Sequence, residues 1–300
     1  MHRRSRMQPK RIAILGSILV GIPLILSVLW APQRSVGIPY PANNGYEDFL
    51  RAVPLVSKSI PELHSTNITE WQSFITSNRV AMTHVRAGLG KSCLSSNKYD
   101  FKTTDLISMI GAFKYIGHTF RAEAIVALHE DRTNDAVAAT MEGMRFANES
   151  SRGGVIIEAS LVMAVEKIVL ERFTPTIADL DQGNTAFALS NLLELDESAP
   201  AIEGFFEREE QVRHQFADRW QYLLYRVGVG RKTIRDNEDR FRKAFQQSVV
   251  KRKKVVIRLA KRMHELTHGK PAASWSDVVP EFVPAPLIDP STERPVRFTP

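Results

Sequence analysis

The letters HELTH, which begin at His264, carry the one pattern in this chain that could do catalytic chemistry. On a helix the spacing places His264 and His268 on one face with Glu265 beside them. Zinc peptidases use this HExxH arrangement, with both histidines as metal ligands and the glutamate as general base on metal-bound water. A third ligand would have to be Glu281 or Glu293, and both lie in a proline-rich tail.

The same five residues also have a structural interpretation. Gly269 and Pro271 follow His268 directly and end the helix there, whereas peptidase helices continue. A histidine in the last turn interacts favourably with the helix dipole, and a glycine after it suits the left-handed conformation of a helix end. The sequence favours the helix end, so we expect no catalytic residue, no metal ligand and no cofactor. A zinc hydrolase using His264, Glu265 and His268 is the alternative.

A second group of residues could bind a partner without doing chemistry. The helix expected over residues 232–268 carries four cations at helical spacing, which we call the basic ridge: Lys251, Lys254, Arg258 and Lys261. An apolar stripe is expected on the opposite face: Phe241, Phe245, Val249, Val256, Leu259 and Met263.

The basic ridge has two interpretations. It is either a solvated outer face or a site for an anionic partner, such as an acidic envelope protein or anionic lipid. In the first case acidic residues elsewhere would balance its charge, for instance Glu203, Glu207, Glu209 and Glu210.

The distribution of charge argues against nucleic-acid binding over a broad surface. The net charge is +7 over 300 residues, but residues 1–11 hold five Lys and Arg and no acid, which leaves 35 basic against 33 acidic residues. Residues 231–262 alone hold 13 basic and three acidic residues, so the rest of the chain is mildly acidic. Nucleic-acid binding is therefore not expected.

An uncharged apolar run, residues 12–32, predicts a transmembrane anchor in contact with membrane lipid. Residues 1–11 form a basic tail that the positive-inside rule places in the cytoplasm. The bulk of the chain would then be periplasmic, on a single-pass protein of the inner membrane. A cleaved signal peptide is the alternative, but the run exceeds the usual 7–15 residues and lacks a small-x-small cleavage site.

The remainder predicts an all-α domain over residues 46–268, after a linker at 33–45. Apolar residues recur every three or four positions, and strand patterns are nearly absent. Residues 103–130 and 133–149 form the clearest unit, an αα-hairpin of the tetratricopeptide kind. Cys93 is the single cysteine, which excludes an internal disulfide and favours a buried, inert thiol.

The last 32 residues, 269–300, predict an extended strap, because their prolines forbid a helix. The apolar residues expected to pin it to the helical body are Val278, Phe282, Val283, Leu287 and Ile288.

The tail also carries a resemblance. Residues 268–298, HGKPAASWSDVVPEFVPAPLIDPSTERPVRF, together with the glycine pair and apolar helix that start near residue 153, resemble uncharacterised membrane-anchored helical proteins of planctomycete-type bacteria. Those proteins end in a frame of HG, LVP, DP and Arg-aromatic elements, from which this chain departs at Lys270, Ala272 and Glu293. The resemblance implies no activity. The sequence as a whole predicts a single-pass membrane-anchored, non-enzymatic interaction or scaffold module.

Overall fold

The computed structural model describes residues 40–62, 65–95, 103–216 and 231–298. The predicted cytoplasmic tail at 1–11, the anchor at 12–32 and most of the linker at 33–45 lie outside these residues. Within the described ranges, no helix combines the length and hydropathy needed to cross a bilayer.

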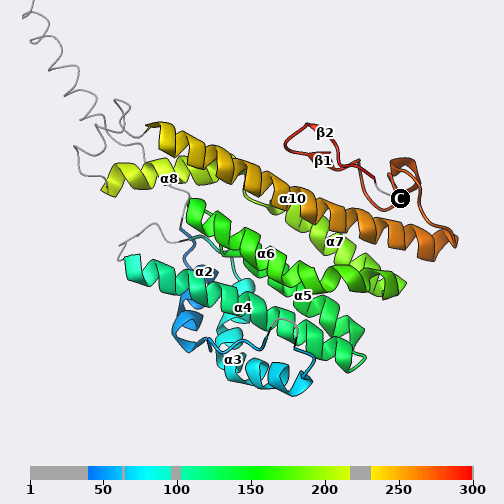
Figure 1. Cartoon of the computed structure of the whole chain (residues 1–300), viewed down its shortest axis with the longest axis horizontal. Helices are drawn as coiled ribbons and strands as arrows, with labels where there is room; N and C mark the ends of the chain where they lie inside the picture. Colours follow the sequence, from blue (N-terminus) through cyan, green and yellow to red (C-terminus); the bar gives the residue numbers. More distant parts are fainter. Residues whose placement is uncertain (1–39, 63–64, 96–102, 217–230, 299–300) are drawn as a thin grey trace, which may run out of the picture. The chain divides into compact units, whose positions relative to one another are not determined.

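The described residues confirm the all-α prediction (Figure 1). The α-helices are α2 (Gly45–Ala52), α3 (Ile68–Leu89), α4 (Thr103–His129), α5 (Thr133–Glu149), α6 (Ile156–Thr176), α7 (Gln182–Ser198), α8 (Ile202–Phe216) and α10 (Arg231–His268). Short 3-10 helices are η1 (Val53–Leu55), η2 (Ile177–Asp179) and η3 (Trp275–Asp277). Strands β1 (Ile288–Asp289) and β2 (Arg294–Pro295) form a small antiparallel pair.

Side-chain caps explain where several helices begin. The Asn44 side chain accepts a hydrogen bond from the Tyr46 amide at 3.1 Å, so α2 begins at Gly45, the last residue of the predicted linker. Asn67 caps α3 and Asp181 caps α7 in the same way. These oxygens satisfy amides that have no partner inside the helix.

The predicted αα-hairpin is present as α4 and α5, which pack against each other and against α6 (Figure 1). Its core is aromatic. Phe146 of α5 meets Phe113 of α4 and Phe49 of α2 edge to face, with ring centroids 5.4 and 5.1 Å apart. All three rings are fully buried, so this cluster joins α2 to the hairpin.

Two buried features support that core. Gly143 of α5 lies so close to α4 and α6 that a Cβ there would be 3.0 Å from Phe120 and 2.9 Å from Val169. Cys93 is buried, as predicted, and burial raises the pKa of its thiol to about 12. The thiol is therefore protonated at neutral pH.

Helix α10 is fixed to the rest of the domain by a buried ion cluster. Arg252 donates to Glu166 of α6 at 2.5 Å and to Asp196 of α7 at 3.0 Å. The Arg252 and Glu166 side chains are only 7% and 6% exposed. Burial alone would lower the pKa of Arg252, but the two carboxylates outweigh it and raise that pKa above its usual value.

The C-terminal segment packs on α10 as a strap with a turn and a short hairpin. Val278 and Val283 are fully buried in the main core, and Phe282 and Leu287 pack against it, as predicted. Ile288 was expected to be pinned as well, but it is 44% exposed. It starts β1, and its main chain, not its side chain, makes the contact, because its carbonyl accepts a hydrogen bond from Lys253 at 2.9 Å.

We expect Arg252→Ala to lower the free energy of unfolding by about 3–5 kcal/mol, because it leaves Glu166 buried without its cation. Chemical denaturation of the full-length chain measures this change. The matched control is Lys251→Ala at the adjacent, exposed position, which should cost less than about 0.5 kcal/mol. Equal losses in both variants would contradict the structural role of the ion cluster.

His118 of α4 makes stability depend on pH. Its Nδ1 atom is buried and makes no hydrogen bond within the described part of the chain. Burial, assisted by the nearby Arg121, lowers the pKa of His118 from 6.5 to about 4. Between these two pH values the unfolded chain binds a proton that the folded chain does not. Stability is therefore lost as the pH falls through this window.

We expect His118→Leu to remove about 2 kcal/mol of the pH dependence of unfolding between pH 6.5 and pH 4, because leucine cannot titrate. Denaturation curves at a series of pH values measure it. The control is His129→Leu at an exposed position on the same helix, which should keep the original dependence. A slope that His118→Leu leaves unchanged would refute the assignment.

Candidate functional site: the outer face of α10

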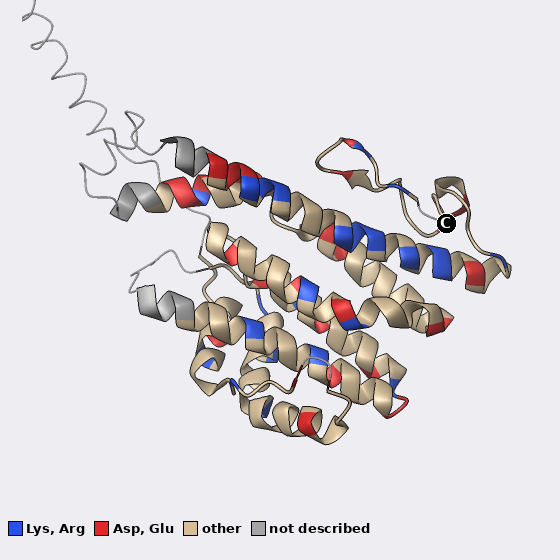
Figure 2. Ribbon diagram, in the orientation of Figure 1, with Lys and Arg blue, Asp and Glu red and all other residues tan. Residues whose placement is uncertain are grey.

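The predicted basic ridge lies on the outer face of α10. Lys251, Lys254 and Arg258 are exposed, while Val256, Leu259 and Met263 of the predicted apolar stripe are buried. Figure 2 shows Lys and Arg following one another along the second half of α10, with acidic residues near its beginning. From Lys251 to Lys261 the ridge extends about 15 Å, at the helical rise of 1.5 Å per residue.

From Lys251 to the end of α10, the cations fall into two groups. Those that face other elements are paired: Arg252 with Glu166 and Asp196, Lys253 with Asp196 at 3.5 Å, and Arg262 with the Leu180 carbonyl at 3.0 Å. Among the ion pairs of the described residues, none includes Lys251, Lys254 or Arg258. From Lys251 to the end of α10, the cations that no described acidic residue pairs with are therefore confined to the ridge.

Lys261 differs from the other three ridge residues. It is half-buried, and its ammonium lies over the ring of Phe298 in the strap, 5.4 Å from the centroid. This cation–π contact holds the end of the strap against the ridge. Lys261 thus has a structural contact in addition to its place in the row of cations.

The acidic helix α8 does not neutralise the ridge. It packs beside the first part of α10, where Phe206 meets Phe241 and Phe205 meets Phe245, each pair with centroids 5.9 Å apart. Glu203 of α8 ion-pairs with Arg242 at 2.8 Å. This contact lies nine residues before Lys251, or about 13 Å along the helix.

The HELTH segment forms the end of α10. Gly269 follows His268 with a positive φ of 68°, and its amide bonds to the Glu265 carbonyl at 2.8 Å. The His264 ring is buried, and its Nδ1 donates to the Lys270 carbonyl at 2.9 Å, since a carbonyl can only accept. The prediction that the glycine takes the left-handed conformation at the helix end is confirmed.

The other two residues of the motif are engaged as well. His268 Nε2 lies 3.0 Å from the carboxylate of Glu281, and Glu265 is exposed and ion-pairs with Arg262 at 3.0 Å. The rings of His264 and His268 are 4.6 Å apart. Over the described ranges, no group of three or more His, Cys, Asp or Glu residues is placed to hold a metal ion.

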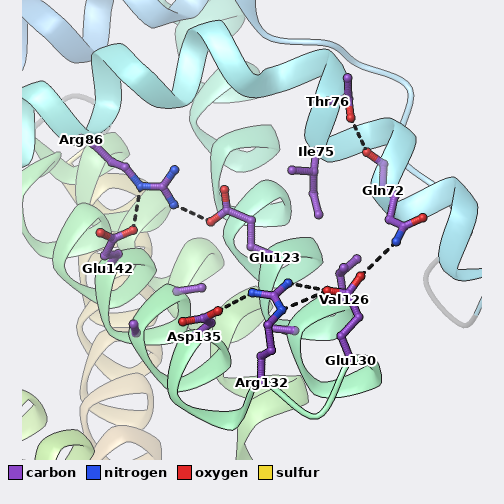
Figure 3. A pocket seen from close by; sticks show the side chains of 13 residues that line it. Gln72, Ile75, Thr76, Arg86, Glu123, Val126, Glu130, Arg132, Asp135 and Glu142 are labelled. Carbon is purple, nitrogen blue, oxygen red and sulfur yellow. Dashed lines mark hydrogen bonds and ion pairs between the residues drawn. The ribbon is translucent and has the colours of Figure 1, made fainter.

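Sequence reasoning missed a hollow of about 490 Å³ between α3, α4 and α5 (Figure 3). Its rim carries two arginines: Arg86, held by carboxylates of α4 and α5, and Arg132, held by carboxylates two and three residues away in the chain. The only signal in the sequence was the abundance of small residues on α4 and α5. Alanines at a helix interface predict close packing, and do not tell where that packing leaves a gap.

Comparison of the chain with protein-family models, with curated proteins and with solved structures gives no match. The resemblance of the C-terminal tail to membrane-anchored helical proteins therefore stays a prediction.

We expect the full-length chain to retain no zinc after incubation with the metal and desalting, because among the described residues no third His, Cys, Asp or Glu joins His264 and His268 in a group that could hold a metal ion. Mass spectrometry of metal content tests this, with His264→Ala and the exposed His129→Ala as a matched pair. About one zinc per chain, lost in His264→Ala and kept in His129→Ala, would contradict the helix-end interpretation and support the hydrolase.

Proposed function

We propose that this chain is a non-enzymatic, single-pass membrane-anchored module whose helical domain lies outside the cytoplasm and binds an acidic protein through the basic ridge. One observation carries the binding site: from Lys251 to the end of α10, the cations that no described acidic residue pairs with lie on one exposed face, while those facing other elements are paired. The membrane anchor rests on residues 12–32 and their basic flank.

Electrostatics explains why such a face would be used for binding. Exposed cations on a solvated helix contribute little to folding, so their alignment is not required for stability. A row of like charges raises the local potential and attracts a chain of opposite charge, which also speeds association. Lys251, Lys254 and Arg258 project into solvent along about two turns of helix, which suits an extended acidic segment.

The packing of α10 favours a protein over a lipid surface. Amphipathic helices that bind membranes insert their apolar face between the lipids. Here the apolar residues on the C-terminal half of α10 are buried against other helices, as Val256 and Leu259 show with exposures of 1% and 0%. The ridge therefore offers a partner exposed cations and no exposed apolar stripe. Exposed cations are sufficient to attract an acidic polypeptide.

The test uses fluorescent poly-glutamate as an extended acidic chain and the full-length protein in detergent. We expect binding that weakens at least about tenfold between low salt and about 0.5 M salt, because the contact is exposed and screened. The triple variant Lys251→Glu, Lys254→Glu and Arg258→Glu should reduce affinity at least about tenfold and leave the circular dichroism spectrum unchanged.

The matched control reverses three exposed cations elsewhere, Arg79→Glu, Lys114→Glu and Arg145→Glu, and should retain binding. A loss of the same size in both variants would show that net charge, not the ridge, governs binding. Vesicles containing phosphatidylglycerol form the second arm. Ridge-dependent binding to vesicles without binding to poly-glutamate would replace the acidic protein by anionic lipid.

A further inference from the structure

The hollow between α3, α4 and α5 has a charged rim and an apolar floor. One rim cluster holds Arg86, whose guanidinium donates to Glu123 at 2.6 Å and to Glu142 at 2.9 Å. The other holds Arg132, which pairs with Asp135 and, at 2.6 Å, with Glu130. Figure 3 shows the two clusters on different sides of the hollow, with Ile75 directed into the space between them.

Each arginine faces two carboxylates, so the rim keeps a charge of about −2 at neutral pH. Gln72 donates to Glu130 at 3.1 Å and adds no charge. The internal pairs therefore satisfy the arginines and leave excess negative charge. That excess is complementary to a cation.

The least exposed of the four carboxylates is Glu123, whose side chain is 17% exposed. Burial raises the pKa of Glu123 above its usual value, and the neighbouring Glu142 adds to this, although Arg86 opposes the change. Arg86 thus does not fully compensate the cost of keeping this carboxylate ionised. A further cation placed nearby would lower that cost.

The floor is made of small and aliphatic side chains from all three helices. Val126, Ala127 and Ala139 are at most 7% exposed, and Ala138 and Ile75 are half-buried. A volume of about 490 Å³ falls in the range of known ligand pockets, which are mostly apolar with a few placed polar groups. The floor can therefore accept an aliphatic side chain.

We propose that this groove binds a peptide segment in which an aliphatic side chain is flanked by arginine or lysine residues. The aliphatic group fills the floor against Ala138 and Ile75. The flanking cations meet the two acidic clusters on the rim, which lie on different sides of that floor. A free amine or metal ion would match only one of these features, whereas the peptide matches both. This site is separate from the basic ridge and selects the opposite charge.

The test titrates the full-length chain into fluorescein-labelled pentapeptides and follows anisotropy. The probes alternate arginine with leucine, arginine with serine, and glutamate with leucine. We expect the arginine–leucine peptide to bind at least about tenfold more tightly than either of the others, because only it carries both features.

Two variants assign that binding to the groove. Glu130→Gln with Asp135→Asn removes charge from the rim, and Ala138→Leu fills part of the floor at a half-buried position. Each should weaken binding of the arginine–leucine peptide at least about tenfold. The matched control, Glu194→Gln with Glu197→Gln, makes the same charge change at exposed positions of α7 and should leave affinity unchanged.

Three outcomes would overturn the proposal: equal binding of all three peptides, binding that both groove variants leave intact, or a loss of equal size in the α7 control. Thermal melts of each variant show whether the fold is retained. The triple ridge variant serves as a further check, because it should leave this binding intact.

Discussion

The position of Arg252 determines how α10 presents its charges. A guanidinium that is 7% exposed has to keep its carboxylates, since an isolated buried charge costs several kcal/mol. Glu166 and Asp196 come from α6 and α7, so Arg252 can be satisfied only when α10 faces both helices. This requirement sets the rotation of α10 about its axis. Once the rotation is set, helical geometry turns Lys251, Lys254 and Arg258 outward.

The same rotation of α10 also places the side chains that bind the strap. Lys253 points to the strap side and donates to the Ile288 carbonyl, while His264 donates to the Lys270 carbonyl at the helix end. Both contacts satisfy main-chain oxygens in a segment that has little secondary structure of its own. Buried Val278 and Val283 supply the apolar part of the attachment. The proline-rich tail is thus held by a few side chains at fixed positions.

The sequence predicted those features that depend on local signals. The bounds of α5 follow from residues within one helical turn, and the structure confirms them. The exposure of the Ile288 side chain and the presence of the groove could not be predicted from such local signals. Each depends on which distant element lies opposite, and a hydrophobic pattern contains no such information. The pairing of Arg86 with Glu123 and Glu142 joins residues 37 and 56 positions apart.

The HELTH motif also shows that a sequence pattern contains no information about which distant groups surround it. Its spacing is sufficient to align two imidazoles, but whether they are free to bind a metal depends on groups that the motif does not contain. Here the Lys270 carbonyl and the Glu281 carboxylate each bond one nitrogen of a ring, and among the described residues no third side chain joins the two histidines in a group that could hold a metal ion. The basic ridge differs in this respect. Helical spacing aligns its cations, and no acidic residue of the described chain pairs with Lys251, Lys254 or Arg258. A pattern indicates function only when its tertiary surroundings leave its groups available. By that criterion the ridge is the stronger candidate, although HELTH is the more specific motif.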